Sequence, residues 1–271
     1  RKQADVLQHL GGSLHRQWRQ YRKRLKRCQK HFSEEAVHRS RVETRRLLAT
    51  IELLSAFIPE REIAKARRAL KDHLDSFARL RDTQVQLRYL EHLVRAFPAA
   101  RQFRQWLRKR EARYIRRTRK AVRNIKTRRL GKRLAMFEKE LRRRRKKTSP
   151  GRAFVLAQGA IRLAFGRVAE LCRRVTATDT RTIHRTRVAF KRFRYMVDAL
   201  SPLLPAVSEE HRQAMRGYQS LMGDIQDVEV LLAALDQFIE REQNDRESLH
   251  LRAEFARRRE QLITVYLNAS D

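Results

Sequence analysis

The sequence has few of the residues that punctuate or crosslink a chain: its 271 residues contain 8 Gly, 5 Pro and 2 Cys. Two cysteines, Cys28 and Cys172, exclude a disulfide framework and a cysteine-built zinc site, and they suit a reducing compartment. We expect both to be buried as small apolar residues. The scarcity of Gly and Pro leaves few turn signals and favours long regular elements.

Long apolar runs and aromatic residues are scarce as well. The most apolar stretch, 47–59, contains Glu52 and is too short to cross a bilayer. No signal-peptide pattern opens the chain. Aromatic residues make up 7% of the sequence and form no stacking platform among the basic residues, which argues against dedicated binding of single-stranded nucleic acid. The sequence begins with Arg1 rather than Met, so a domain or targeting segment before it stays an open alternative.

Acidic residues are the third shortage. Only 30 Asp and Glu stand against 65 Lys and Arg, which gives a formal net charge of +35. Such an excess predicts a polyanionic partner: nucleic acid, polyphosphate or an anionic membrane. Arginine supplies 51 of the 65 cations. Because a guanidinium group can bind two phosphate oxygens at once, this bias favours phosphate over a merely negative surface.

What the sequence does contain is helical periodicity. Apolar residues make up 41% of the chain and recur at helical spacing, so they can fill a core, and no alternating run predicts a strand. The fold class we expect is therefore all-α. The expected helices are 3–30, 34–57, 60–75, 77–96, 99–147, 152–176, 180–200, 208–222, 224–243 and 246–268. Ser33 followed by Glu34-Glu35 is typical of a helix N-terminus.

One cationic stretch is written twice. His38-x-x-Arg41-x-x-x-Arg45-Arg46 returns 146 positions later as His184-x-x-Arg187-x-x-x-Lys191-Arg192. A second element also repeats, since the segment 80–90 matches 225–235 in its aspartate and apolar positions. These repeats predict two halves, 1–147 and 150–271, related by an approximate two-fold, with Ser149-Pro150-Gly151 as the seam.

Residues 101–147 carry 23 Lys and Arg against three glutamates. Apolar residues at helical spacing predict one long helix with a single packed stripe. Two interpretations of this helix stay open. It is either a solvated helix ending in a basic linker, or one wall of an anion-binding site.

On a helix each copy of the motif forms a cationic row. At about 100° per residue, His38, Arg41 and Arg45 fall within an arc of about 60°, opposite the apolar Leu47, Ile51 and Leu54. In the second copy the row consists of His184, Arg187, Lys191 and Arg194. Two such rows suit a linear polyanion better than a compact ligand, which would need only one cluster. The additional donors that flank the rows are Arg39, Arg46, Arg185 and Arg192.

Carboxylates accompany the rows. Glu52 and Asp198 take equivalent places at the far end of each row, where we expect them to orient or neutralise guanidinium groups; Arg194–Asp198 is an i,i+4 pair. A catalytic role for these carboxylates is the less favoured alternative. We expect Asp82 and Asp227 to be structural acceptors for buried arginine or helix ends rather than metal ligands.

No catalytic, metal or cofactor site is predicted. Neither His38 nor His184 has a His, Cys or carboxylate at i+3 or i+4, so the two do not form a metal site. A Gly-rich phosphate loop, a nucleophile elbow and a His-Glu-x-x-His motif are all missing from the sequence. A lone helical histidine is more often structural than functional. Two at matching repeat positions, each heading a cationic row, favour contact with a ligand.

At these residues the sequence resembles the conserved histidine α-helical domain, known as the CHAD family. The resemblance rests on both His-x-x-Arg-Val segments, on 192–195, on 80–85 and on 221–227. It implies two four-helix-bundle-like halves related by pseudo-two-fold symmetry around a basic central cavity. It also implies binding of inorganic polyphosphate, with polyphosphate granules as a location.

Carried over by position, the resemblance implies the following polyphosphate-binding residues: His38, Arg41, Arg45, Arg46, His184, Arg187, Lys191, Arg192 and Arg194. Leu48 stands where the second copy has Arg194, so we expect the first half to bind less tightly. Ala78 stands where the second copy has Gly223, so the packing of the two copies should differ there.

We therefore expect a non-enzymatic, cytoplasmic polyphosphate-binding domain. The alternatives are a general nucleic-acid-binding protein, which the charge allows although no reader motif is present, and, less favoured, a metal-dependent polyphosphate phosphohydrolase. An acidic membrane surface is a weaker choice. The sequence leaves the oligomeric state open.

Overall fold

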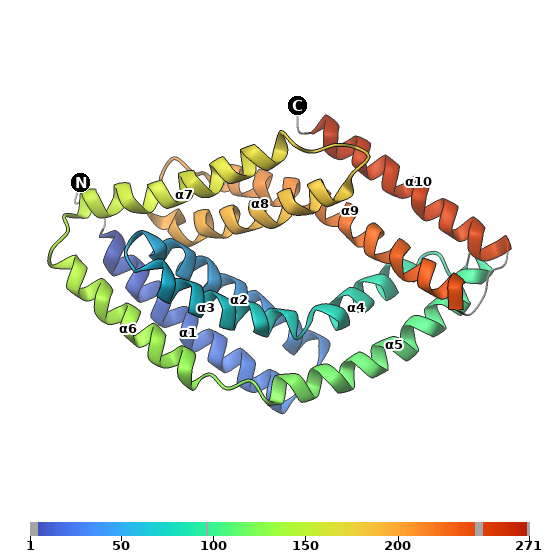
Figure 1. Ribbon diagram of the computed structural model, residues 1–271, viewed down its shortest axis with the longest axis horizontal. Helices are drawn as coiled ribbons and strands as arrows, with labels where there is room; N and C mark the ends of the chain where they lie inside the picture. The colour runs from blue at the N-terminus through green and yellow to red at the C-terminus, as the bar shows by residue number, and fades with distance from the viewer. Residues whose placement is uncertain (1–4, 96, 242–245, 270–271) are drawn as a thin grey trace. The chain divides into compact units, whose positions relative to one another are not determined.

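The computed structural model describes residues 5–95, 97–241 and 246–269 and is helical throughout, without a strand in those ranges. The predicted all-α class is confirmed (Figure 1). The helices are α1 (Val6–Lys30), α2 (Glu34–Leu53), α3 (Glu60–Asp75), α4 (Ala78–Leu90), α5 (Pro98–Arg123), α6 (Arg128–Arg145), α7 (Pro150–Cys172), α8 (Thr180–Leu200), α9 (Glu209–Arg241) and α10 (Arg246–Asn268). Short 3₁₀ turns follow α2 (Leu54–Ala56) and α8 (Ser201–Leu203).

The chain forms two compact units, each built from three segments. Unit 1 comprises Arg1–Phe77, Arg119–Arg173 and Val188–Arg212, and unit 2 comprises Ala78–Thr118, Arg174–Arg187 and Gln213–Asp271. Each unit therefore contains sequence from both sides of the predicted seam at 149–151. The internal repeat and its approximate two-fold stay predictions.

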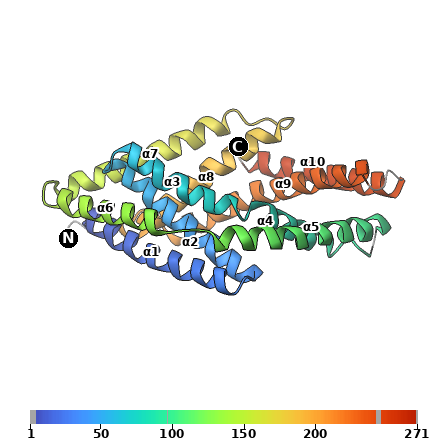
Figure 2. The same cartoon turned by 60° about the horizontal axis from the view of Figure 1, so that its bottom comes forward.

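Unit 1 is a layered helical bundle. In it α1 packs against α2, α6 and α7, while α3 packs against α2 and α6, an arrangement that Figures 1 and 2 both show. Its core contains fully buried Leu14, Tyr21, Leu47 and Ile51. The α2 helix begins where the sequence predicts, because the Ser33 hydroxyl accepts the backbone N–H of Ala36 at 3.1 Å.

Unit 2 has its own core. Side chains from α4, α5, α9 and α10 meet there, with Phe103 and Phe238 in ring contact at 5.5 Å and the Tyr89 and Phe255 rings edge to face at 5.9 Å. The Gln86 side chain donates to the carbonyl of Val230 at 2.9 Å and so joins α4 to α9. Both units thus have enough buried apolar surface to hold their helices in place.

The predicted long helix over 99–147 is wrong. The structure divides it into α5 and α6, with a break at residues 124–127. The amide of Gln29 on α1 donates to the carbonyls of Val122 (3.0 Å) and Ile125 (3.3 Å), which supplies partners for the end of α5. Neither Gly nor Pro lies at residues 124–127, so the usual sequence signals of a helix break are missing there.

The opposite error concerns α9. A break at Gly223 was predicted between 208–222 and 224–243, but α9 is continuous from Glu209 to Arg241. Gly223 has no positive φ, and a single glycine inside a helix costs only about 1 kcal/mol relative to alanine. The predicted helix ends at residues 3, 96 and 243 lie outside the described residues.

The two cysteines differ in burial. Cys28 is fully buried, as expected, and burial raises the pKa of its thiol to about 11. Cys172 is only half-buried, so the expectation of burial is wrong for this residue. It lies at the last position of α7, where the helix ends and covers it less. Among the described helices, none is long and apolar enough to cross a membrane.

Candidate functional site

The first cationic row lies on α2 in unit 1. Leu47, Ile51 and Leu54 are fully buried, whereas His38 is exposed and Arg41 and Arg45 are half-buried. The predicted division of this segment into a packing face and a cationic face is therefore confirmed for α2. Half-burial restricts an arginine side chain, and in Arg41 it reaches the guanidinium group, whose Nη1 atom is buried.

The second row lies on α8 and repeats the burial pattern. His184 is exposed, Arg187 and Lys191 are half-buried, and Arg192 is exposed, matching His38, Arg41, Arg45 and Arg46 in order. The helix runs from unit 2 into unit 1 after Arg187. His184 and Arg187 are accordingly described with unit 2, and Lys191, Arg192 and Arg194 with unit 1.

In unit 1 a buried carboxylate joins α2, α3 and α8. Glu52 is 3% exposed. Its Oε1 accepts from Nε of Arg67 at 2.7 Å, and its Oε2 accepts from Nη2 of Arg67 at 2.8 Å and from Nη2 of Arg192 at 2.6 Å. The predicted role of Glu52 in neutralising guanidinium groups is confirmed. The same ion pairs bring Arg192 of the second copy onto the helix that carries the first.

Sequence reasoning missed Arg67. It belongs to α3, outside both copies of the motif, and it also pairs with Glu60 at 2.8 Å. These carboxylates raise the pKa of Arg67, chiefly through its hydrogen bonds to Glu52. The nearest available signal was the buried position of Glu52 on α2, because a buried carboxylate requires a cationic partner.

The remaining predicted cations of unit 1 have local acidic partners. Arg46 pairs with Glu43 at 2.9 Å and stays exposed. Arg194 is buried, with its side chain 9% exposed; it pairs with Asp198 at 2.6 Å and lies over the Tyr195 ring at 4.4 Å. The predicted Arg194–Asp198 pair is confirmed. Contact between Arg194 and a ligand stays a prediction, and it would require the side chain to leave these partners.

In unit 2, His184 borders an open pocket of about 410 Å³. Its basic side chains are those of Arg181, His184 and Arg185, and among the described residues that line it Glu229 is the one carboxylate. The Nδ1 atom of His184 forms a hydrogen bond with Oε1 of Gln226. Because an amide oxygen only accepts, Nδ1 carries the proton and Nε2 becomes a second donor when the ring is protonated.

Arg187 lies beside α9 in unit 2. Its Nε and Nη2 atoms are 3.8 Å from where a Cβ on Gly223 would lie. Burial raises the pKa of Asp227 and that of Asp224, and the charge of Arg187 partly offsets both shifts. Arg81 also acts on Asp227. The expectation that Asp227 interacts with arginine therefore has support. Gln226 and Gly223 also lie beside the second row, and the sequence analysis did not identify them as neighbours of it.

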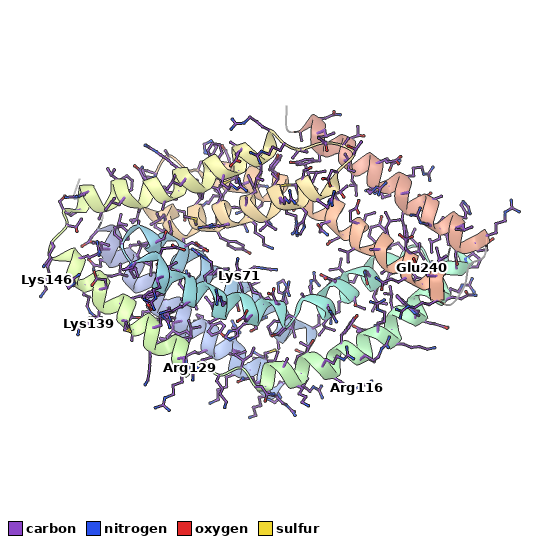
Figure 3. All side chains as sticks on the ribbon, viewed as in Figure 1. Lys71, Arg116, Arg129, Lys139, Lys146 and Glu240 are labelled. Carbon is purple, nitrogen blue, oxygen red and sulfur yellow. The ribbon has the colours of Figure 1, made fainter. Side chains whose placement is uncertain are left out.

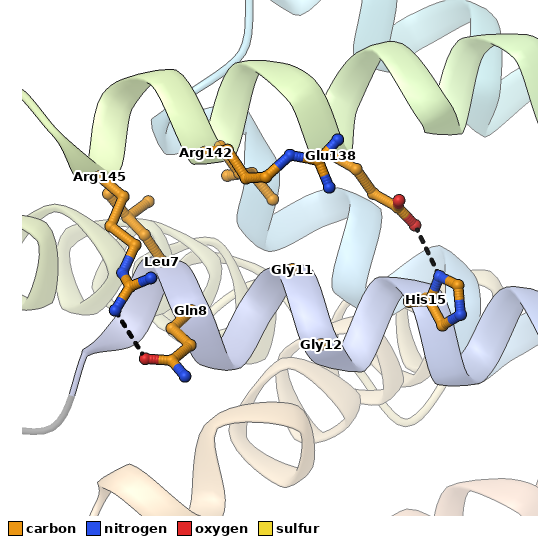
Figure 4. A pocket seen from close by; sticks show the side chains of 9 residues that line it. Leu7, Gln8, Gly11, Gly12, His15, Glu138, Arg142 and Arg145 are labelled. Atoms are coloured by element: carbon orange, nitrogen blue, oxygen red, sulfur yellow. Dashed lines mark hydrogen bonds and ion pairs between the residues drawn. The ribbon is translucent and has the colours of Figure 1, made fainter.

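The α6 helix and Lys146, which follows its last residue, add cations to the outside of unit 1. Arg129, Lys139 and Lys146 project into solvent there (Figure 3). A groove of about 320 Å³ between α1 and α6 is different in character: Glu138 pairs with His15 at 3.4 Å inside it, and Arg145 donates to Gln8 at 2.9 Å (Figure 4). Arg142 and Arg145 are the arginines that line this groove, and its lining includes no residue of either row.

The described residues contain no group of three or more His, Cys, Asp or Glu side chains that could hold a metal ion. Three carboxylates beside the rows, Glu52, Asp198 and Asp227, each interact with arginine. The arrangement can bind anions.

One family model matches the chain, and two solved structures share its fold. The family described as the CHAD domain matches residues 12–236, which is most of the chain. A crystal structure of the CHAD domain from the plant Ricinus communis superposes with a TM-score of 0.64 at 17% identity, covering 97% of this chain and 86% of that one. PptA from Streptomyces chartreusis superposes with a TM-score of 0.68 at 14% identity, covering 98% of both chains. No curated protein matches the sequence.

Proposed function

This chain belongs to the CHAD domain family, and from that premise we propose that it binds inorganic polyphosphate without chemical turnover. The binding residues are those of the two rows: His38, Arg41, Arg45, Arg46, His184, Arg187, Lys191, Arg192 and Arg194. The observation that carries the proposal is the matched burial of the two rows, with an exposed histidine followed by two half-buried cations in each.

Half-buried guanidinium groups suit phosphate physically. A linear polyphosphate presents oxygens at regular intervals, and each arginine can bind two of them. The packing beneath α2 already restricts Arg41 and Arg45, so less side-chain entropy is lost on binding than at a flexible surface lysine. A row therefore binds more tightly than the same number of scattered charges.

The buried carboxylate of Glu52 orients arginine side chains without using all of their hydrogen-bond donors. Glu52 holds Arg67 and Arg192, while the Arg192 side chain remains 52% exposed. Arg192 can thus share its donors between Glu52 and a phosphate oxygen. In unit 2, Gln226 fixes the ring of His184 at the edge of the pocket.

The decisive experiment removes equal charge from two places. One variant carries Arg41→Gln, Arg45→Gln and Lys191→Gln. Its control carries Lys23→Gln, Lys26→Gln and Lys30→Gln, which are exposed positions on α1. Titration with long-chain polyphosphate should show Kd raised at least about tenfold in the row variant and less than about threefold in the control. Equal losses in the two variants would refute recognition by the rows.

Two further measurements separate the rival functions. Competition between polyphosphate and single- or double-stranded nucleic acid, at matched phosphate concentration, should favour polyphosphate. Equal affinity would point to unspecific electrostatics instead. Release of orthophosphate on addition of Mg²⁺ or Mn²⁺ would reveal a phosphohydrolase, and we expect none. Co-localisation with polyphosphate granules, lost in the row variant and kept in the control, would place the same binding in the cell.

The histidines predict a pH dependence of binding. The charge of histidine side chains in general changes between about pH 8 and pH 5, and His184 lines the pocket that also contains Arg181, Arg185 and Glu229. Polyphosphate affinity should therefore rise on mild acidification. A His38→Gln/His184→Gln variant should lose most of that rise, and an unchanged rise would exclude the histidines as ligand contacts.

A further inference from the structure

The outer face of α7 in unit 1 is apolar where a surface helix is expected to be polar. Its inner face packs into the core through Ala153, Ala157 and Val168. On the opposite face Leu163 is 78% exposed, Val155 65% and Leu156 40%. In a sequence that is 35% charged, Arg162 and Arg167 are the only charged residues between Ala153 and Ala169.

Two glycines lie on the same outer face. A Cβ added at Gly159 or at Gly166 would meet no atom of the described residues within 4 Å. No contact among those residues therefore requires glycine at these positions, although glycine weakens a helix. Small residues on an exposed helical face allow a second helix to approach closely, and its larger side chains then fill the space that they leave.

The spacing of this face is that of a helix–helix seam. Arg152, Leu156, Gly159, Leu163, Gly166 and Glu170 follow one another at intervals of four and three residues. Alternating steps of four and three keep side chains on one stripe facing a partner helix. The seam is about 27 Å long at a rise of about 1.5 Å per residue.

The seam is complementary to the same seam on a second, antiparallel copy of the helix. Counted outward from Ile161, Arg152 and Glu170 are both nine residues away, Leu156 and Gly166 are both five away, and Gly159 and Leu163 are both two away. In an antiparallel pair centred on Ile161, each leucine faces a glycine of the other helix. Each end brings an arginine opposite a glutamate.

We propose that this face of α7 docks a second copy of the chain as an antiparallel, two-fold symmetric dimer. The four apolar layers each place one leucine against one glycine, and Arg152 of one copy pairs with the carboxylate of Glu170 of the other. Within its own chain Glu170 accepts from Arg167 at 2.5 Å, and a carboxylate can accept from more than one guanidinium group. A two-fold contact of this kind closes on itself and gives a dimer rather than a fibre.

Charge opposes this association. Each copy has a formal net charge of +35, and the two Arg162 side chains lie close to the two-fold axis. The contact is a single helix pair and therefore at the small end of specific interfaces, so we expect a Kd of about micromolar magnitude. Added salt screens the repulsion between the copies, hence dimerisation should strengthen with salt, whereas polyphosphate binding should weaken.

Sedimentation of the full chain without polyphosphate, at 50 and 500 mM NaCl, tests the proposal. The wild type should form dimers, with a lower Kd at the higher salt. Gly159→Gln/Gly166→Gln fills both recesses with a good helix former, so the chain stays folded while Kd rises at least about tenfold. Arg152→Glu alone should also weaken the dimer, and Arg152→Glu/Glu170→Arg should restore it, because each end again joins opposite charges.

Several results would overturn this dimer. They are a wild type that stays monomeric to about 200 μM at both salt concentrations, a dimer indifferent to the glycine substitutions, and a double charge swap weaker than the single one. Flotation with phosphatidylglycerol vesicles adds one more arm. If Leu163→Gln abolishes vesicle binding while the wild type sediments as a monomer, the face serves a membrane surface and the dimer is refuted.

Discussion

At the scale of single residues, Glu52 is the side chain on which the cationic site of unit 1 depends most. It is a buried carboxylate shared by Arg67 and Arg192. Removing one partner of a buried ion pair is costly, since the other charges remain without their acceptor. The side chain of Arg192, in contrast, is 52% exposed and can turn to water.

Glu52→Ala should therefore lower the free energy of unfolding by about 3 kcal/mol. The matched change Arg192→Gln should lower it by about 0.5 kcal/mol, because Glu52 keeps its hydrogen bonds from Arg67 and the Arg192 side chain is 52% exposed. Urea denaturation in a Trp106→Phe background, where Trp18 of unit 1 is the remaining tryptophan, measures both. Similar losses in the two variants would mean that Glu52 is not the buried anchor.

A second residue-scale prediction concerns His73 of unit 1. Burial lowers its pKa, with the charge of Asp72 acting in the opposite direction, and its Nδ1 contacts the hydroxyl of buried Tyr21. The unfolded chain therefore takes up a proton below about pH 6.5 more readily than the folded chain does. Stability supplied by the neutral ring is complete above that pH and is lost as the pH falls.

The free energy of unfolding should accordingly be lower at pH 5.5 than at pH 7.5. In His73→Gln the difference between the two pH values should shrink, while the other histidines contribute equally to both proteins. A pH difference as large in the variant as in the wild type would assign the effect elsewhere.

The sequence predicted the features that follow from spacing within one helix and missed the contacts between different helices. The faces of α2, the acceptor role of Glu52 and the Arg194–Asp198 pair followed from helical spacing alone. Arg67 did not, because it reaches Glu52 from another helix, and a contact between helices leaves no periodic signal. The same holds for Gln226 beside His184.

At the scale of helices, glycine context decides stability. Gly131 on α6 lies against Trp18, and a Cβ there would be 3.0 Å from the indole ring. Trp18 has little freedom to yield, since its ring stacks on Tyr21 at 5.5 Å. Gly217 on α9 has open space around the same position.

Gly217→Ala should consequently raise the free energy of unfolding by about 0.8 kcal/mol through helix propensity. Gly131→Ala should lower it by about 1 kcal/mol, because the clash with the indole exceeds the propensity gain. Thermal or urea denaturation of the two variants checks both signs. A stabilising Gly131→Ala would show that α1 and α6 separate easily.

Helix boundaries show where sequence reasoning ends. Capping by Ser33 and the prolines at 59 and 98 mark real starts. The break between α5 and α6 has no such mark, since the amide of Gln29 from α1 stabilises it. Gly223, conversely, resembles a stop but lies inside α9, next to the guanidinium group of Arg187.

At the scale of the whole molecule, the net charge of +35 favours anionic partners of every kind. Any polyanion is attracted, so attraction alone identifies none of them. A specific site differs from unspecific attraction in that particular side chains account for the counterions released when the polyanion binds. The number of released counterions appears in the salt dependence of binding.

The most direct test of polyphosphate recognition by the rows is therefore the slope of log Kd against log salt concentration. By analogy with single-stranded nucleic acid, removing three contacting cations should make the slope shallower by about two. We predict that change for Arg41→Gln/Arg45→Gln/Lys191→Gln and a nearly unchanged slope for Lys23→Gln/Lys26→Gln/Lys30→Gln. Identical slopes for the two variants would contradict the account, because the bound polyphosphate would then make no distinction between the rows and the remaining basic surface.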